Sequence, residues 1–378
     1  MPMSSTHDAI VIGGGLVGAA IAWGLRSQGL DTVLLDEGDV AYRASRGNFG
    51  LVWVQSKGLG APHYQRWTRA SAGEWPALAA DLTARTGLDP GLRQPGGVQI
   101  CLSEQEFEER AARMERMRAE AGNFGFDFRM IRREEGLAEM LPGLGPKVVG
   151  ASFTPYDGHA NPLVLLHALH RAFTEAGGTY VPNAKVEGDT HAAPRDFAVT
   201  AGGRRFAAPR IVLAAGLGNA ALAPRFGLSA PVRPQRGQII VTERTREVLP
   251  MPVTTIRQTT EGSVMLGDSV EEVGFDLRQK PEVIRVIADR AVASFPWIGR
   301  LNIVRAWSAL RVMAPDGLPI YDQAERFPGA FTANCHSGVT LAGAHARLLA
   351  PMIAAGALDG ERLGRFTAAR FGAASAAA

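Results

Sequence analysis

Residues 8–37 read DAIVIGGGLVGAAIAWGLRSQGLDTVLLDE. The apolar residues 9–12 predict a short buried strand, and the apolar run 19–25 predicts a helix. Between them, Gly13-Gly14-Gly15-Leu16-Val17-Gly18 matches the pattern G-x-G-x-x-G. Residues 32–35 predict a second strand, which ends at Asp36. This order of strand, glycine turn, helix and strand is typical of a βαβ unit that binds a dinucleotide.

Each glycine of this turn has its own physical role. Gly13 permits a tight turn, Gly15 lets backbone approach a pyrophosphate, and Gly18 lets the helix pack against the strand. The helix N-terminus then offers free N–H groups to the phosphates. Asp36 stands where an acid accepts a ribose 2′-hydroxyl and repels a 2′-phosphate, so FAD or NAD is favoured over NADP. The alternative is an ordinary glycine-rich turn, and the presence of both strands, the helix and the acid argues against it.

Composition narrows the class of protein. The 378 residues are 46% hydrophobic, enough for two or three domains with packed cores. Forty basic residues against 37 acidic ones give a net charge of +3, which does not indicate a nucleic-acid partner. Cys101 and Cys335 are too few for a disulfide framework or a zinc site, so we expect a reducing, cytoplasmic location. The uncharged run 9–25 is too rich in glycine, and preceded by Asp8, to be a signal peptide or a membrane span.

The remainder of the chain alternates between predicted helices and strands. A loop at residues 44–53 carries small polar residues that can meet a flat polar ring. Helices are expected at residues 62–87, 104–121, 163–177, 281–295 and 339–356, and strands at 98–102, 179–182, 210–215, 235–241, 262–268 and 330–334. Residues 197–206 predict a hairpin. We expect the strands at 98–102, 235–241 and 262–268 to form an antiparallel sheet.

Three further features have alternative interpretations. His167 and His170 stand three residues apart on a predicted helix, but without a third ligand nearby they are better explained as ordinary helix histidines than as a metal site. Residues 216–221 match G-x-G-x-x-A and could open a second nucleotide site, although no acid follows at the required spacing. Arg311 is a single cation among apolar residues, so it requires an anionic partner in the protein or in a ligand.

Several blocks in order along the chain resemble the FAD-dependent D-amino acid oxidase superfamily, in its glycine oxidase and sarcosine oxidase branch. They are GGGLVGAAIAWGL, the acid Asp36, DGHANPLVLLHAL, IVLAAG, PQRGQIIV, LRVMAPDGLPI and HSGVTLAG. The blocks ASRGNFGLVWVQSKG and CHSGVTLAG are most similar to the beta subunits of D-hydroxyproline dehydrogenases and opine oxidases, which act on octopine or nopaline. The likeness covers nearly the whole chain.

The resemblance implies an α/β fold with a discontinuous Rossmann-like FAD-binding domain and a mixed or antiparallel substrate domain. The FAD-binding domain would comprise residues 1–90, 146–222 and 300–378, and the substrate domain residues 91–145 and 223–299. The IVLAAG block becomes a second contact with the same FAD, and the turn after Cys335 would direct N–H groups at the flavin ring. The expected cofactor contacts are Ile12, Gly13, Gly15, Leu16, Val17, Asp36, Glu37, Ser45, Arg46, Asn48, Gly50, Leu51, Val186, Ala215, Gly216, Ser337, Gly338, Val339 and Thr340.

The resemblance also implies a reaction. Arg311 would hold the substrate carboxylate, because a guanidinium fits a carboxylate fork. A hydride would pass from the carbon beside a neutral amine to flavin N5, giving an imine that water hydrolyses. His336 is expected either to accept a proton or to be a structural imidazole. Ala309 stands where covalent sarcosine oxidases carry cysteine, so noncovalent FAD is expected, and the family's second carboxylate-binding cation is not evident near Cys335.

Three functions remain open from the sequence. The first is an amino acid or amine dehydrogenase that passes electrons to alpha and small iron–sulfur-type subunits of a complex. The second is a free-standing oxidase that gives electrons to oxygen and releases hydrogen peroxide. The third is a flavin-binding assembly subunit without catalysis of its own.

Overall fold

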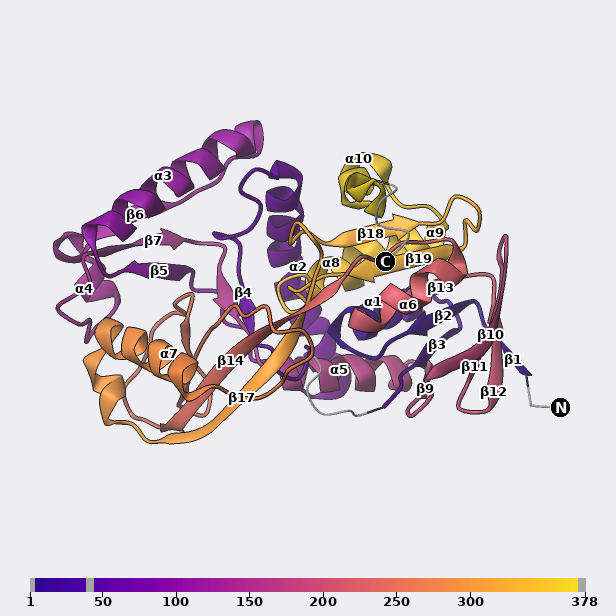
Figure 1. The fold of residues 1–378 in the computed structure, drawn as a ribbon, viewed down its shortest axis with the longest axis horizontal. Coiled ribbons are helices and arrows are strands. Elements are labelled where there is room, and N and C mark those ends of the chain that lie inside the picture. Colours follow the sequence, from indigo (N-terminus) through magenta and orange to yellow (C-terminus); the bar gives the residue numbers. More distant parts are fainter. Residues whose placement is uncertain (1–3, 39–43, 373–378) are drawn as a thin grey trace.

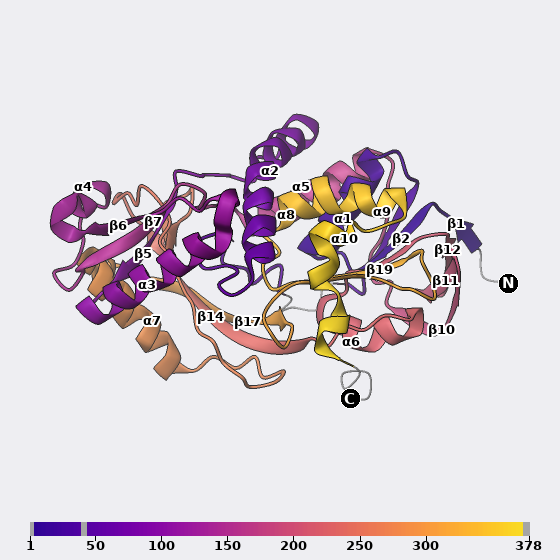
Figure 2. The ribbon, with the colours of Figure 1, turned by 90° about the horizontal axis from the view of Figure 1, so that it is seen from above.

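The computed structural model describes residues 4–38 and 44–372. One half of the molecule is built around a mostly parallel sheet, and the other half around antiparallel strands (Figure 1). A view from above shows that the long paired strands β14 and β17 run from one half to the other (Figure 2). No helix of the described part is long and apolar enough to cross a membrane.

The six-stranded sheet has the order β18-β19-β13-β2-β3-β9, in which only β18 is antiparallel to its neighbour. Its strands, which come from the N-terminal, middle and C-terminal parts of the chain, are β2 (Ala9–Ile12), β3 (Thr32–Leu35), β9 (Thr179–Val181), β13 (Ile211–Leu213), β18 (Ile320–Gln323) and β19 (Ala330–Asn334). β2, β3 and β19 have the predicted bounds. All their residues are buried, as expected for strands covered on both faces.

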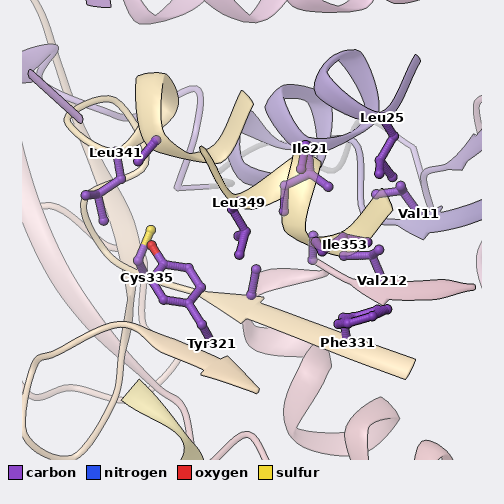
Figure 3. Close-up of a cluster of buried hydrophobic side chains, with 14 of the residues drawn as sticks. Val11, Ile21, Leu25, Val212, Tyr321, Phe331, Cys335, Leu341, Leu349 and Ile353 are labelled. Atoms are coloured by element: carbon purple, nitrogen blue, oxygen red, sulfur yellow. The ribbon is translucent and has the colours of Figure 1, made fainter. Parts of the chain in front are cut away.

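Helices cover one face of this sheet. They are α1 (Leu16–Ser27), α2 (Pro62–Thr86), α5 (Pro162–Glu175), α8 (Ala342–Ala344) and α9 (Ala350–Ala355). Figure 3 shows Ile21 and Leu25 of α1 in the same buried cluster as Val11 and Val212 of the sheet and Ile353 of α9. Each such buried aliphatic side chain stabilises the fold by about 1.5–3 kcal/mol.

The predicted helix 339–356 is interrupted. A wider π turn at His345–Leu349 separates α8 from α9. Pro351 lies in the first turn of α9 and has no N–H to donate to the preceding turn, which accounts for the break. α1 approaches this segment closely, because a Cβ on Gly24 would lie 2.3 Å from the carbonyl oxygen of Ala346.

The opposite face of the sheet packs against a four-stranded layer, β1-β12-β11-β10. These strands are β1 (Ser4–Thr6), β10 (Val186–Ala193), β11 (Asp196–Ala201) and β12 (Arg204–Ala208). β11 and β12 form the predicted hairpin. Elsewhere, β4 (Leu51–Val52) pairs with β8 (Gly158–His159), and the short helices α6 (Asn219–Leu222) and α10 (Gly360–Leu363) follow β13 and α9.

The antiparallel half contains two sheets. One has the order β15-β16-β14-β17, with β14 (Arg233–Arg244), β15 (Ile256–Gln258), β16 (Ser263–Leu266) and β17 (Ile303–Met313). The other has the order β5-β7-β6, with β5 (Gly97–Cys101), β6 (Arg129–Arg132) and β7 (Gly150–Thr154). The helices α3 (Glu104–Ala121), α4 (Leu137–Met140) and α7 (Pro281–Ser294) belong to this half.

The predicted antiparallel sheet is only partly correct. β14 and β16 pair as expected, but β5 pairs with β7 and meets the other sheet through the single bridge between Val98 and Val253. β7 was not foreseen, because Gly150-Ala151-Ser152-Phe153-Thr154 lacks clear alternation.

The division into two domains stays a prediction. Two strand pairings cross its proposed boundaries. β7 and β17 fall in the proposed FAD-binding domain, but they pair with strands assigned to the substrate domain. The remaining single turns of 3-10 helix are Gly122–Phe124, Arg133–Glu135, Gly216–Gly218, Ala223–Phe226, Pro296–Arg300, Gly364–Phe366 and Ala368–Phe371.

Candidate active site

The glycine turn between β2 and α1 is closely packed. Gly13 has φ of +106°, and a Cβ there would lie 2.4 Å from the carbonyl oxygen of Ala214. A Cβ on Gly18 would lie 1.8 Å from the carbonyl oxygen of Gly13. Neither position accommodates a side chain without backbone movement. Gly15, by contrast, has an ordinary φ of −70° and would bring its Cβ only against the Ser45 Oγ.

Asp36 closes the turn from the end of β3. Its carboxylate accepts hydrogen bonds from the backbone N–H of Gly14 at 2.6 Å and of Gly38 at 2.9 Å. It lines a cavity of about 420 Å³, here called the Asp36 cavity, together with Gly14, Gly15, Gly38, Ser45, Arg46, Leu163, Leu166, His167, His170, Tyr180, Pro182 and Asn183. The carboxylate therefore lines a cavity beside the glycine turn, and its contact with a ribose stays a prediction.

The two helix histidines belong to the wall of the Asp36 cavity. His170 Nε2 lies 2.7 Å from the carbonyl oxygen of Gly14, and burial lowers the pKa of this imidazole, so it donates to that carbonyl in its neutral form. Its ring packs edge-on against Tyr180. Within the described ranges, no three His, Cys, Asp or Glu side chains are arranged to hold a metal ion.

A second cavity of about 470 Å³, the loop cavity, lies along the carboxyl ends of β2, β13 and β19. It is lined by Gly13, Gly15, Leu16, Val17, Glu37, Ala44, Ser45, Asn48, Ala214, Ala215, Gly216, Leu217, Gly218, Phe275, Leu277, Leu310, Val312, Ala333, Asn334, Cys335, His336 and Gly338. Ligands of open α/β sheets bind outside the carboxyl ends of the strands. The backbone N–H of Leu16, in the first turn of α1, donates to Ser45 Oγ at 2.9 Å.

The turn at residues 216–221 does not favour a second nucleotide site. Gly216 and Gly218 line the same cavity as Gly13, and the helix that follows has only four residues. The buried Asn219 accepts from the backbone N–H of Ala215 and donates to the carbonyl oxygen of Leu213 and to Asn334. Its amide thus fixes the turn to the ends of β13 and β19.

A third cavity of about 320 Å³, the Arg311 cavity, adjoins the loop cavity. Ala44, Asn48, Leu310 and His336 line both. Its other lining residues are Gly47, Phe49, Leu51, Trp53, Ser56, Lys57, Gln235, Gly237, Ile239, Thr254, Asp268, Val270, Ala309, Arg311, Met313, Ser337, Val339 and Thr340. The two cavities therefore lie next to each other.

Arg311 extends from β17 across Gly237 of β14, where a Cβ would lie 2.5 Å from its Nη2. Nη2 donates to Asp268 Oδ2 at 2.6 Å, and Nη1 donates to the carbonyl oxygens of Ser269 at 2.8 Å and Arg236 at 3.3 Å. The anionic partner that the sequence required is thus Asp268. The Arg311 side chain is 23% exposed and keeps hydrogens on Nε and Nη2 without a partner among the described residues.

His336 faces a lysine that the sequence analysis missed. Lys57 Nζ lies 2.9 Å from His336 Nε2. Burial, together with the charges of Lys57 and Arg311, holds the pKa of His336 well below its usual range, so its imidazole is neutral at pH 7 and accepts a hydrogen from the lysine. Burial and then Arg311 lower the pKa of Lys57 to about 8.

A signal for Lys57 was present in the sequence. It is the single charged residue between Arg46 and Arg66, and one of only four lysines in the chain.

The half-buried position of Lys57 is explained by a buried network under the preceding residues. Gln55 donates to Asp157 at 2.6 Å and accepts from Arg110 at 2.8 Å, and the backbone N–H of Val54 also donates to Asp157. Burial raises the pKa of Asp157 to about 6.

The C-terminal loop is fixed from both sides. Thr340 Oγ1 donates to the carbonyl oxygen of Leu51 at 3.0 Å, Tyr64 contacts Ser337 Oγ at 3.3 Å, and Trp75 donates to the carbonyl oxygen of Val339 at 3.0 Å.

Most of the residues expected to contact FAD line one of the three cavities. Ile12, Gly50 and Val186 do not, and all the individual FAD contacts stay predictions.

Comparison with known proteins agrees with this geometry. The model of the DAO family, described as FAD dependent oxidoreductase, matches residues 8–352. An opine oxidase subunit from Rhizobium meliloti is 46% identical over 366 residues, which cover 97% of this chain and 98% of that protein. Glycine oxidase of Geobacillus kaustophilus (strain HTA426) is 27% identical over 362 residues, covering 93% of this chain and 94% of that enzyme.

The crystal structure of glycine oxidase from Geobacillus kaustophilus superposes with a TM-score of 0.86 at 26% identity, covering 96% of this chain and 98% of that one. The expected fold, a Rossmann-like FAD-binding part with a substrate-binding part, is therefore confirmed. The chain is an FAD-dependent enzyme and belongs to the DAO family of FAD-dependent oxidoreductases.

Proposed function

We propose that this chain is the catalytic subunit of a dehydrogenase that oxidises the C–N bond of an amino acid or secondary amine of the D-hydroxyproline or opine type. The observation that carries the proposal is that the loop cavity and the Arg311 cavity adjoin each other and share Ala44, Asn48, Leu310 and His336 in their walls. A half-buried guanidinium and a neutral imidazole thus line the cavity beside the space that we assign to the cofactor.

The residues of the loop cavity fit FAD. Gly15 lines the loop cavity without a Cβ, which leaves space at its backbone for a pyrophosphate, whereas Gly13 and Gly18 let the turn and the helix pack closely. The Asp36 carboxylate lies in the wall of a separate cavity, which shares Gly15 and Ser45 with the loop cavity and no residue with the Arg311 cavity. When bound, FAD supplies the hydride acceptor at flavin N5.

The protein's own side chains would bind and orient the substrate. Arg311 offers hydrogens on Nε and Nη2 to a carboxylate. His336, neutral and already accepting from Lys57, adds no negative charge beside the substrate nitrogen, and the positive charges of Lys57 and Arg311 would favour the unprotonated amine. No side-chain nucleophile is required for this chemistry.

The electron acceptor separates the competing functions. The relatives from Rhizobium meliloti and Agrobacterium tumefaciens are each named as one subunit of an opine oxidase, which supports a multi-subunit complex for this chain. We propose that its partners are alpha and small iron–sulfur-type subunits. The alternative is a free-standing oxidase like the glycine oxidases. Catalytic peroxide release by the purified chain alone would support that alternative.

The decisive experiment is anaerobic reduction of the flavin by D-hydroxyproline, D-proline, glycine, sarcosine, octopine and nopaline in turn. We expect at least one secondary amine of this set to bleach the flavin, with little peroxide formed by the lone chain in air. Failure of every amine to bleach a fully loaded flavin would favour the assembly-subunit alternative and contradict the proposal.

We predict that the FAD is noncovalent. Ala309 lies in the wall of the Arg311 cavity, where it offers no thiol. Cys335 does line the loop cavity, but burial raises the pKa of its thiol to about 12, so it is protonated and unreactive at neutral pH. Denaturation in acid should release all the yellow colour into the supernatant, whereas flavin retained by the precipitate would contradict the prediction.

A further inference from the structure

The positive charge of Lys57 is not paired with a carboxylate among the described residues that line the Arg311 cavity. Among the described residues that line this cavity, the charged side chains are Lys57, Arg311 and Asp268. Asp268 is bound to Arg311 at 2.6 Å. Lys57 has no carboxylate within ion-pair distance in the described part of the chain, and its hydrogen-bond partner is the neutral His336.

A half-buried cation without a counterion is costly, and a ligand carboxylate would relieve that cost. The ammonium group gives one hydrogen to His336 and keeps two for another acceptor. The buried network of Arg110, Gln55 and Asp157 holds the segment that ends at Lys57, so the lysine is prepositioned. Prepositioned cations bind anions with less loss of side-chain entropy.

We propose that Lys57 is a specificity-determining residue that binds a second substrate carboxylate, so that the site takes a secondary amine with a carboxylate on each of its two N-substituents. This inference rests on the function proposed above. One carboxylate would lie on the free hydrogens of Arg311, the other on Lys57, and the nitrogen between them in the Arg311 cavity. Arg311 alone would serve for an amine with one carboxylate.

Two unreactive ligands test this assignment. Thiodiacetate has two carboxylates and (methylthio)acetate has one, and each carries sulfur in place of the nitrogen, so neither is an amine substrate. Both are titrated into the FAD-loaded protein, and binding is read from flavin absorbance and from the fluorescence of Trp53, which lines the cavity. The fluorescence signal requires neither turnover nor flavin, so a failed amine screen does not affect this test.

Lys57→Met should raise the dissociation constant of thiodiacetate by about tenfold or more, since hydrogen bonds to charged groups contribute roughly 1.5–3 kcal/mol. It should change the constant for (methylthio)acetate by less than about twofold. Lys57→Arg should keep most of the preference for thiodiacetate. Lys147→Met is the matched control, because Lys147 is exposed and lines none of the three cavities.

Two outcomes would overturn the proposal. Equal weakening of both ligands by Lys57→Met would mean that Lys57 and Arg311 share a single carboxylate. Unchanged binding of both ligands would mean that Lys57 does not reach the substrate.

We also predict a pH dependence that belongs to this lysine. Burial and then the charge of Arg311 lower the pKa of Lys57 to about 8, against the opposing effects of Asp268 and Cys335, and the lysine also faces the neutral His336. Its charge is therefore present below pH 8 and lost above it, so the preference for thiodiacetate over (methylthio)acetate should fall as the pH rises through 8. The Lys57→Met variant should show no such fall between pH 7 and 9.

Discussion

Gly15→Val should lose most of its FAD while remaining folded. The backbone of Gly15, with φ of −70°, accepts any side chain, and its Cβ would meet only the Oγ of Ser45. Gly15 lines both the loop cavity and the Asp36 cavity, so the added methyl groups would occupy space that the pyrophosphate needs. Overpacking of this kind costs about 1–3 kcal/mol, which weakens FAD binding by roughly five- to 150-fold.

Flavin content per chain and titration of the apoprotein with FAD measure this effect. Gly73→Val is the control, because Gly73 is exposed on α2 and a Cβ there meets no atom within 4 Å. Gly18→Ala offers a contrast, since its Cβ would strike the backbone of Gly13 and should lower the stability of the fold as well. If Gly15→Val kept stoichiometric FAD, the pyrophosphate would not bind at this turn.

The βαβ unit could be predicted from the sequence because most of the interactions that shape it are local. Every determinant of that unit lies within about thirty residues, and Gly18 and Asp36 contact Gly13 and Gly14 of the same unit. The bounds of β2 and β3 follow directly. Helix α3 was predicted equally well, because Ser103 caps its N-terminus by accepting from the N–H of Glu106.

Pairing between distant segments was harder to predict. β5 was assigned to the wrong sheet because its partner β7 lies about fifty residues further along and has no alternating pattern. Loop closure over such distances leaves no local mark in the sequence. The interruption of helix 339–356 could have been predicted from Pro351, had its missing N–H been weighed against the apolar periodicity.

The candidate site shows the same difference between features set by the local sequence and features set by long-range pairing. Arg311 was identified because a lone cation in an apolar strand requires a partner, but that partner, Asp268, is brought in by the pairing of β14 with β16 and β17. Lys57 and His336 lie 279 residues apart and meet only in the folded protein. The sequence alone predicted one cation and one imidazole, whereas the structure joins them to a second cation.

Arg311→Leu should raise the apparent dissociation constant of every carboxylate substrate by about tenfold or more, because a charge-assisted pair contributes roughly 1.5–3 kcal/mol. Arg305→Leu is the matched control, since Arg305 is exposed on the same strand and packs over Trp307 outside the three cavities. Arg311→Lys should recover little, because an ammonium group cannot reproduce the guanidinium fork. Steady-state KM and the ligand titrations measure both effects.

The two cations make opposite predictions for a ligand with one carboxylate. Arg311→Leu should weaken (methylthio)acetate and thiodiacetate alike, whereas Lys57→Met should weaken thiodiacetate alone. Asp268 limits the effect of Arg311→Leu on stability, because its side chain is 48% exposed and can be solvated once its partner is lost. If Arg311→Leu left both constants unchanged, Arg311 would serve only to hold the Asp268 segment on β14, and Lys57 would be the primary carboxylate-binding residue.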